Sequence, residues 1–308
     1  MNVVSIIMYH YVRPILKSKF PGIKGLELEA FNRQLNFLEE NFSIITTEQL
    51  IEAVTKGTKL PLNACWLTFD DGYKDHFEHV LPELLKRKIS AAFFPPKTAI
   101  MNNKILDVNS IHHILSSVND TNLLLNELNE NCLSHGINRD SLNSYYKEFA
   151  VASRFDNADI IYFKRMLQHV LPINIRSSIT SMLFKKYVGV SEAEFSSKLY
   201  MSLEELRMLV KCGMYVGSHG SMHVWLNRIS EEKQREDIMD SLQFLEDIGT
   251  KTKDWIMCYP YGAYNDATIT LLKRFEAAVA VTTDARRADL MFDNPLTLPR
   301  LNTNDFPQ

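Results

Sequence analysis

The chain of 308 residues has few cysteines and no excess of basic charge. Its four cysteines, Cys65, Cys132, Cys212 and Cys258, are scattered and form no Cys-x-x-Cys pair. This spacing argues against a disulfide scaffold or a cysteine-rich zinc site and is typical of buried thiols in a reducing compartment. Lys and Arg number 34 against 37 Asp and Glu, which gives a net charge of −3. Because no basic field is available to hold a polyanion, we expect no nucleic-acid partner.

Long hydrophobic runs are also missing. No stretch approaches the roughly 20 apolar residues that a membrane-spanning helix requires. The first apolar run, residues 3–8, has no basic residue before it and is too short for the core of a signal peptide. We therefore expect no membrane span and a cytoplasmic location, with peripheral membrane association left open. The remaining composition, 45% hydrophobic and 23% charged, is that of a globular protein.

Short runs rich in β-forming residues alternate with stretches of helical period. The candidate strands are residues 3–8, 64–69, 90–94, 214–217, 255–259 and 277–282, and the candidate helices are residues 30–41, 75–87, 203–211, 231–247 and 266–275. Ser202 and Ser230 are placed to cap the third and fourth of these helices. Strands that alternate with helices predict an α/β fold with a mostly parallel sheet, either open or closed into a barrel.

The segment from about residue 102 to residue 200 has a different pattern. It has few strand-like runs, long helical patterns, and no proline between Pro96 and Pro172. We interpret it as an all-helical insertion. The sequence thus predicts a single domain over residues 1–308, with a core of residues 1–101 and 201–308 and a helical insertion over about residues 102–200.

Two adjacent carboxylates, Asp70 and Asp71, close the candidate strand 64–69 and precede Gly72. At the C-terminal end of a parallel strand, such side chains point into the crevice where these folds place their sites. Two neighbouring carboxylates cannot both be bare charges in one environment without penalty, so a metal on one would separate their roles. A plain Asp-Asp-Gly turn that caps the next helix is the alternative at this point.

Two histidines four residues apart, His219 and His223, follow the candidate strand 214–217. On a turn or a first helical turn, this spacing presents both imidazoles to one side. Two neutral imidazoles and one carboxylate would leave open positions on a divalent metal for water and substrate. A polar loop with two solvated histidines is the alternative.

Other candidate site residues also follow predicted strands. Tyr259, Pro260 and Tyr261 come at the end of the run 255–259, where aromatic rings could shape the wall of a sugar-sized groove. Core and turn packing is the commoner use of such tyrosines. His10 lies just past the first strand, a suitable place for a general acid, although a structural histidine is the alternative.

The segment from Thr68 to Gly72 resembles the first motif of the polysaccharide deacetylases, which are carbohydrate esterase family four or the NodB-homology domain. The segment from His219 to His223 resembles the second motif, and Tyr259–Gly262 resembles the third in its strand-end position. The resemblance covers roughly residues 1–100 and 200–308. It implies a distorted (β/α) barrel of about seven strands, a divalent metal, and hydrolysis of an N-acetyl group on a sugar.

The resemblance also implies a role for each matching residue. Asp70 would be the general base, and Asp71 would be a metal ligand together with His219 and His223. A backbone N–H near Tyr73 would help to hold the oxyanion. In the branch of the family that deacetylates biofilm exopolysaccharides, an N-terminal Tyr-His supplies the general acid, and this sequence has His10 after a tyrosine.

Two departures from the family pattern bear on these roles. Cys258 stands where the third motif usually has an arginine that orients the base. No Leu-x-His motif near the C-terminus supplies the usual acid, and Leu298–Leu301 stands in that region instead. Arg300 is therefore a candidate for the missing arginine, with a surface arginine as the alternative.

Three other functions are compared with a metal-dependent sugar N-deacetylase. An aspartyl phosphatase would need an aspartate where Phe69 stands, and it would not use the histidine pair. A catalytically impaired carbohydrate-binding barrel that keeps an inert metal is an open alternative, because Cys258 stands in place of the orienting arginine, although such a barrel would not need to keep both a base and an acid. A deformylase or an amidase acting on a non-polymer substrate stays open.

The expected substrate is an N-acetylated carbohydrate, as a glycan or a glycan precursor used in surface polysaccharide biosynthesis or modification. The histidine and carboxylate ligands suit zinc first, and also cobalt, nickel or iron. The helical insertion could cap the groove, form a contact in a homo-oligomer, or touch a membrane.

Overall fold

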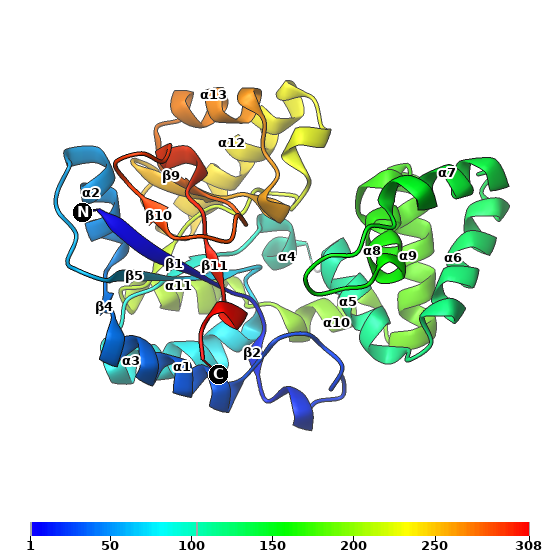
Figure 1. The fold of residues 1–308 in the computed structure, drawn as a ribbon, viewed down its shortest axis with the longest axis horizontal. Helices are drawn as coiled ribbons and strands as arrows, with labels where there is room; N and C mark the ends of the chain where they lie inside the picture. The colour runs from blue at the N-terminus through cyan, green and yellow to red at the C-terminus, as the bar shows by residue number, and fades with distance from the viewer. Residues whose placement is uncertain (1, 103, 308) are drawn as a thin grey trace. The chain divides into compact units, whose positions relative to one another are not determined.

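The computed structural model describes residues 2–102 and 104–307. The chain forms two compact units (Figure 1). The first, which we call the α/β unit, comprises described residues 2–15, 25–102 and 197–307, and the second, the helical unit, comprises residues 16–24 and 104–196. No helix in the described part of the chain is both long and apolar enough to cross a membrane.

A seven-stranded mixed sheet organises the α/β unit. Its order is β10-β1-β5-β6-β7, with β11 also beside β1 and β4 beside β5. All of these pairings are parallel except that of β10 with β1. The bounds are β1 Val3–Tyr9, β4 Ser43–Ile44, β5 Ala64–Asp70, β6 Ala92–Phe94, β7 Tyr215–Val216, β10 Ala288–Asp289 and β11 Leu301–Asn302. The predicted α/β class is thus confirmed, with β10 as an antiparallel addition.

Two smaller sheets complete the strands of this unit. They are β2 (Val12–Arg13) with β3 (Leu26–Glu27), and β8 (Trp255–Cys258) with β9 (Ala277–Val281). Single parallel bridges join Ser218 to Met257 and Val281 to Leu298. All six candidate strands of the sequence correspond to observed strands, each shifted by at most two residues at either end.

Helices accompany these strands in the α/β unit. They are α1 Leu28–Asn41, α2 Thr47–Lys56, α3 Leu81–Arg87, α4 Lys97–Met101, α11 Leu203–Lys211, α12 Glu231–Asp247 and α13 Asp266–Arg274, with α12 beside α13 (Figure 1). The Ser202 and Ser230 side chains cap α11 and α12 as predicted. The predicted helix 75–87 is instead a π-helical turn, η2 (His76–Val80), followed by α3. Such π turns occur frequently at functional sites.

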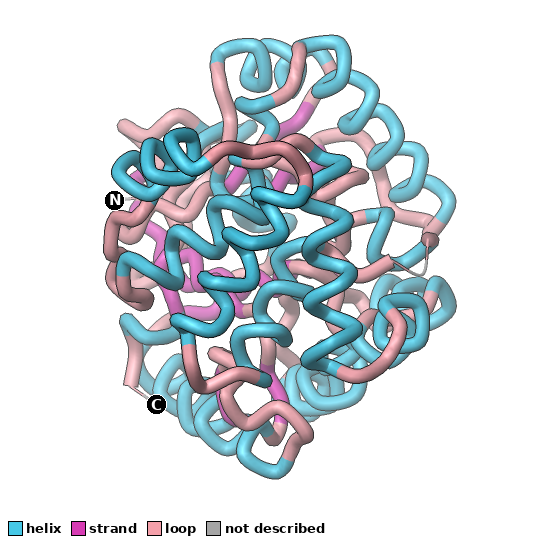
Figure 2. The backbone as a smooth tube through the Cα atoms, turned by 90° about the vertical axis from the view of Figure 1, so that its right-hand side faces the viewer, coloured by secondary structure: helices cyan, strands magenta, loops and turns pink. Residues whose placement is uncertain are grey.

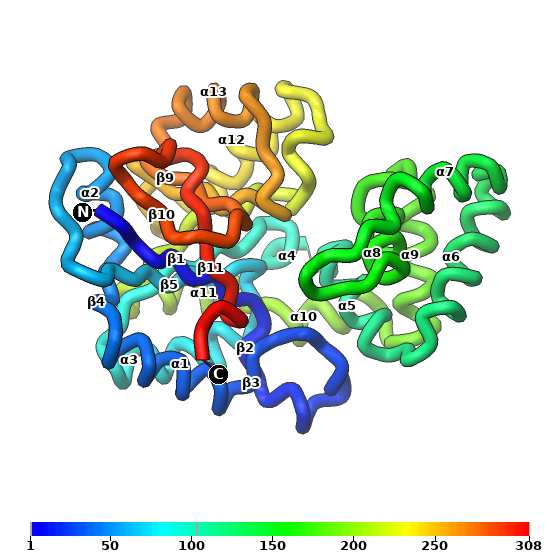
Figure 3. The backbone as a smooth tube through the Cα atoms, in the orientation of Figure 1, coloured from blue at the N-terminus to red at the C-terminus, as the bar shows by residue number. Residues whose placement is uncertain are grey.

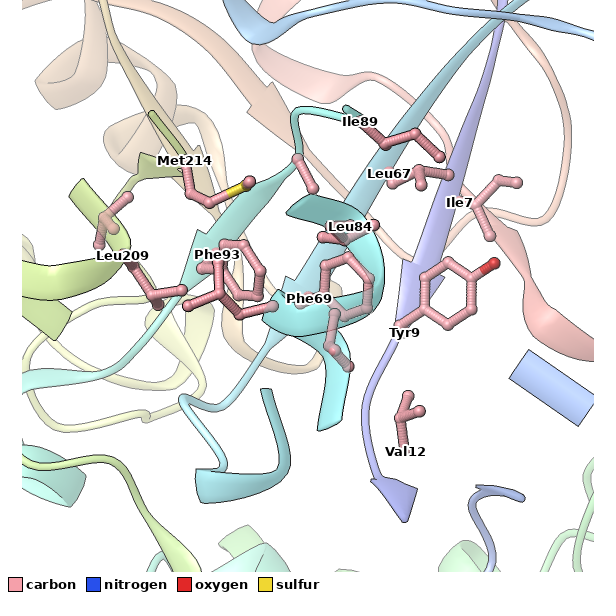
Figure 4. Packing of buried hydrophobic residues seen from close by; sticks show 14 of the residues in the cluster. Ile7, Tyr9, Val12, Leu67, Phe69, Leu84, Ile89, Phe93, Leu209 and Met214 are labelled. Atoms are coloured by element: carbon pink, nitrogen blue, oxygen red, sulfur yellow. The ribbon is translucent and has the colours of Figure 1, made fainter. Parts of the chain in front are cut away.

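The packing around β5 fixes the end of this strand. All seven of its residues are buried, as expected for a strand that is covered on both faces. The ring of Phe69 stacks between Tyr9 and Phe93, with centroids 4.8 and 4.9 Å away, and Leu67 and Leu84 belong to the same cluster (Figure 4). A close-packed interior tolerates little displacement, so the residues that follow Phe69 are held in place.

The helical unit contains α5 to α9 and the start of α10. Their bounds are α5 Asp107–Ser117, α6 Thr121–Ser134, α7 Arg139–Phe149, α8 Ala158–Arg165, α9 Ile173–Val188 and α10 Glu192–Leu199, with a π-helical turn at Met166–Val170 after α8. Figures 2 and 3 show these helices joined by loops, of which the one between α7 and α8 is wide, and α5 packs against α9. No strand lies in the described residues 104–196, in agreement with the helical pattern of this segment.

The four cysteines are all free, as the sequence predicts. Cys65, Cys132 and Cys258 are buried, and Cys212 is partly buried.

Candidate active site

The end of β5 places two buried carboxylates side by side. Asp70 is the last residue of the strand, and Asp71 turns out of it with a positive φ of 70° while its N–H donates to the Phe94 carbonyl. Gly72 continues this turn with φ 69°, and a Cβ there would lie 2.8 Å from the Cβ of Pro95. Glycine is therefore required at this position both by the backbone conformation and by the space available.

Asp71 lies against both histidines of the second motif. Its Oδ1 is 3.4 Å from Nε2 of His219 and 3.3 Å from Nε2 of His223, and all three side chains are buried. The other oxygen, Oδ2, accepts the hydroxyl of Tyr73 at 2.5 Å. This hydrogen bond leaves Oδ1 to face the histidine pair.

The protonation of His219 fits a ligand role. Its Nδ1 lies 2.7 Å from the backbone carbonyl of Cys258, which can only accept a hydrogen bond. Nδ1 therefore carries a hydrogen, so Nε2, which faces Asp71, is the nitrogen left to bind a metal, the pattern of a metal-binding histidine whose other nitrogen is anchored. One oxygen and two nitrogen ligands within 4.8 Å of one another, all buried, fit a divalent metal.

Burial and the close contacts shift the pKa values of this cluster. Although burial alone would raise it, the pKa of Asp71 is held well below its usual range by hydrogen bonds from His219 and His223. Burial lowers the pKa of His223. Burial also opposes charge on His219, but the adjacent Cys258 and Asp71 raise its pKa well above the ordinary value. A metal ligated by His219 must therefore compete with a proton.

Asp237 of α12 supports the turn that carries His219 and His223. The two oxygens of this buried carboxylate accept the N–H groups of Ser221 and Met222 at 3.0 and 2.8 Å. Gly220 has φ 68°, and a Cβ there would lie 2.7 Å from Asp237 Oδ2. Asp237 thereby fixes the backbone between the two candidate metal ligands.

Arg300 pairs with Asp70 through two hydrogen bonds. Its Nη1 and Nη2 donate to the two carboxylate oxygens at 2.8 Å each, and its Nε donates to the Thr282 carbonyl. Arg300 is only 1% exposed, so the alternative of a surface arginine is wrong. Burial would raise the pKa of Asp70, but the charge and hydrogen bonds of Arg300 prevail and lower it to about 2.

His10 lies beside Asp70 and is partly exposed to solvent. Its side chain is 40% exposed, and its Nε2 is 3.8 Å from Asp70 Oδ2. The structure thus brings His10, Asp70, Asp71, His219 and His223 together, although three separate parts of the sequence carry them.

The sequence of this chain matches the model of the polysaccharide deacetylase family over residues 58–161 and 146–280. These ranges span more than half of the chain. The chain belongs to the polysaccharide deacetylase family.

Solved structures of deacetylases have a similar fold. Deacetylase PplD of Streptococcus pyogenes, solved with acetate, shares 17% identity with a TM-score of 0.61 over 97% of this chain and 92% of its own. IcaB of Ammonifex degensii shares 18% identity with a TM-score of 0.59 over 98% and 92%. A de-N-acetylase of Aggregatibacter actinomycetemcomitans shares 14% identity with a TM-score of 0.56 over 98% and 96%. No curated protein matches the sequence.

The third family motif divides into core and site residues. Tyr259 is fully buried, stacks on Tyr264 and donates its hydroxyl to the Leu296 carbonyl. Pro260 is buried as well. Their side chains are therefore part of the core rather than of a substrate surface. Tyr261 is half-buried, has a positive φ of 59°, and its ring centroid lies 4.8 Å from that of His223.

Tyr73, the other tyrosine singled out in the sequence, is also fully buried. Its hydroxyl is bonded to Asp71, so this side chain orients the carboxylate and does not face a substrate.

The sequence analysis did not single out Asp237 and Trp225, which lie at this candidate site. Asp237 lies on the buried face of α12, which also carries Ile238, Phe244 and Leu245, so a carboxylate on this face was a signal that the sequence offered. Trp225 stacks on Tyr261 with centroids 4.8 Å apart and an interplanar angle of 14°. No pattern in the sequence indicates that these two rings meet.

Proposed function

We propose that this chain is a metal-dependent hydrolase that removes the N-acetyl group from an amino sugar of a glycan or a glycan precursor. The observation that carries the proposal is the convergence of an Asp71–His219–His223 ligand set with the Arg300-paired Asp70 and the half-exposed His10. Membership of the polysaccharide deacetylase family supports the same reaction.

Asp71, His219 and His223 would hold the metal, with zinc the first choice and cobalt, nickel or iron as alternatives. When bound, such an ion lowers the pKa of a water and polarises a carbonyl. Tyr73 and the Cys258 carbonyl orient two of the three ligands. Three protein ligands leave room for water and substrate.

Asp70 would accept the proton of the attacking water. Arg300 keeps this carboxylate ionised throughout the neutral range, so it is always able to accept, at the cost of being a weak base. A backbone N–H near Tyr73 would receive the developing oxyanion. His10 would then protonate the departing sugar nitrogen, which is too basic to leave without a proton.

Aromatic side chains beside the metal ligands favour a carbohydrate substrate. The stacked pair of Tyr261 and Trp225 lies next to His223, and both rings are partly exposed. Such rings pack on the apolar faces of pyranose sugars. Tyr261 and Trp225 would bind a sugar ring of the substrate glycan.

We further infer that the α/β unit is a distorted barrel and that residues of about 102–200 are an insertion into a single deacetylase domain. The pairing of β1 with β11, together with the bridges Ser218–Met257 and Val281–Leu298, supports a closed arrangement of the strands.

An inactive carbohydrate-binding barrel was plausible from sequence because Cys258 replaces the orienting arginine of the family. The buried pair of Arg300 with Asp70 removes the main reason for that alternative.

The test is acetate release from a panel of N-acetylated glycans and nucleotide sugars, with chelator and with metal restored. We expect release that the chelator abolishes and zinc restores. The Asp70→Asn variant should be inactive, while Asp266→Asn, at an exposed residue of α13, is the matched control. Binding of the glycans without acetate release would contradict the proposal.

A further inference from the structure

A buried histidine of the α/β unit, His76, contacts the candidate general acid. His76 opens the π-helical turn η2, six residues after Asp70, and is fully buried. Its Nε2 lies 2.8 Å from the backbone carbonyl of His10. Because a carbonyl only accepts, Nε2 carries the hydrogen and donates it to His10. The chain places this donor 66 positions away from its acceptor.

The apolar surroundings of His76 do not explain why a histidine, and not an apolar residue, stands at this position. Its ring packs against Phe69, Tyr73 and Phe93, with centroids 5.4 to 5.8 Å away. Its Nδ1 is buried and has no hydrogen-bond partner among the described residues. A buried polar atom without a partner is unfavourable, and an apolar ring would fill the same space without that cost. Among the described residues, the His10 carbonyl is the hydrogen-bond partner of His76 that an apolar ring could not bind.

The residues that follow His10 contact the residues just before the η2 turn. Tyr11 stacks on Tyr73 with centroids 4.1 Å apart, and Arg13 Nε lies 2.5 Å from Asp75 Oδ2. Residues alternate in direction along an extended segment, so burial of Tyr9 and Tyr11 directs the His10 side chain outward, toward Asp70. His76 binds the backbone of His10 itself.

We propose that His76 is a positioning residue that holds the His10 backbone so that the His10 imidazole stays beside Asp70. The inference rests on the proposed role of His10 as general acid. In this proposal, β5 and the η2 turn that follows it together position the general base Asp70, the metal ligand Asp71 and the general acid His10.

The test compares two leaving groups. An amide needs a proton on its departing nitrogen, whereas 4-nitrophenyl acetate releases a phenolate that needs none, so only the amide depends on the acid. His76→Phe keeps a ring but removes the donor, and His76→Gln keeps an N–H at the same number of bonds from Cβ. His135→Gln, at an exposed histidine of α6's C-terminal end, is the control.

We expect His76→Phe to lower kcat for N-acetyl hydrolysis about 10- to 100-fold, as for a slightly misplaced catalytic group, with KM and bound metal nearly unchanged. Hydrolysis of 4-nitrophenyl acetate should fall far less, and His76→Gln should recover most of the amide activity. In a His10→Ala background, His76→Phe should cost almost nothing further, because the group that it positions is gone.

An equal loss with both substrates, or loss of metal, would show that His76 only supports the fold and would overturn the inference. If His76→Phe does not fold, His76→Met supplies a second donor-free variant for the same comparison. A native enzyme that cleaves the ester but no N-acetylated sugar would instead contradict the proposed function, so the two failures can be told apart.

Discussion

Arg300 and Asp70 lie 230 positions apart in the chain and meet through two hydrogen bonds of 2.8 Å in the buried centre of the α/β unit. The arginine comes from the segment between β9 and β11, whereas the family motif places its arginine at the position of Cys258. The positive charge that keeps Asp70 ionised therefore comes from the residue just before β11 and not from Cys258 at the end of β8.

Removing this arginine is expected to harm both stability and catalysis. Arg300→Met leaves the Asp70 charge buried without a partner, which typically costs about 3–5 kcal/mol of unfolding free energy. Urea unfolding of the variant measures this loss. Arg286→Met, at an exposed arginine, is the control and should change little. Equal stabilities of the two variants would contradict the account.

The same variant should change the pH dependence of activity. Arg300 lowers the pKa of Asp70 to about 2, so in the native protein Asp70 stays ionised far below neutral pH. Without Arg300, burial raises this pKa, and the acid limb of kcat/KM moves to higher pH. Because a depressed pKa stabilises the folded state above the unfolded value, native stability from this pair should fall between about pH 4 and pH 2. An unshifted acid limb in Arg300→Met would contradict this reading.

Asp237 should affect metal binding without touching the metal. Asp237→Ala removes both acceptors of the Ser221 and Met222 N–H groups, so the turn between His219 and His223 loses its support. Loss of such an outer partner typically weakens metal affinity about 10- to 100-fold. Competition with a chelator measures it, and Glu236→Gln, at the exposed neighbour, is the control. Unchanged affinity in Asp237→Ala would exclude this role.

Trp225 should matter for binding and not for chemistry. If its stacked pair with Tyr261 binds a sugar ring, Trp225→Ala should lose about 1 kcal/mol of binding, or roughly fivefold in KM, with little change in kcat. Trp225→Phe should retain most of the affinity. Steady-state kinetics on an N-acetylated oligosaccharide tests this, and a fall in kcat at constant KM would contradict it.

Much of the fold could be predicted because its signals are local. The apolar run that ends at Phe69 and the capping serines Ser202 and Ser230 each determine an element within a few residues. The antiparallel β10 has only two residues, too short for a recognisable pattern. The π turn at His76–Val80 has the same apolar spacing as the helix that was expected there.

The candidate site was predictable only where its residues stand in motifs at strand ends. Asp70, Asp71, His219 and His223 are of this kind. Arg300 was a candidate only because the family arginine is missing at Cys258, and its pairing with Asp70 could not be read from the sequence. Asp237 and His76 act through partners that are distant in the chain, so their roles depend on tertiary packing. Tyr259 shows the converse, because its place in a motif suggested a substrate contact while its ring packs in the core.

The most direct test of the account is to measure bound metal and acetate release together in Asp70→Asn and Asp71→Asn. Asp70 is proposed to move a proton and Asp71 to hold the metal. We expect Asp70→Asn to keep its metal but to lose at least about 100-fold in kcat, as for a removed general base, whereas Asp71→Asn should lose the metal as well. Metal loss in Asp70→Asn, or near-normal acetate release by it, would contradict this division of roles between the two carboxylates.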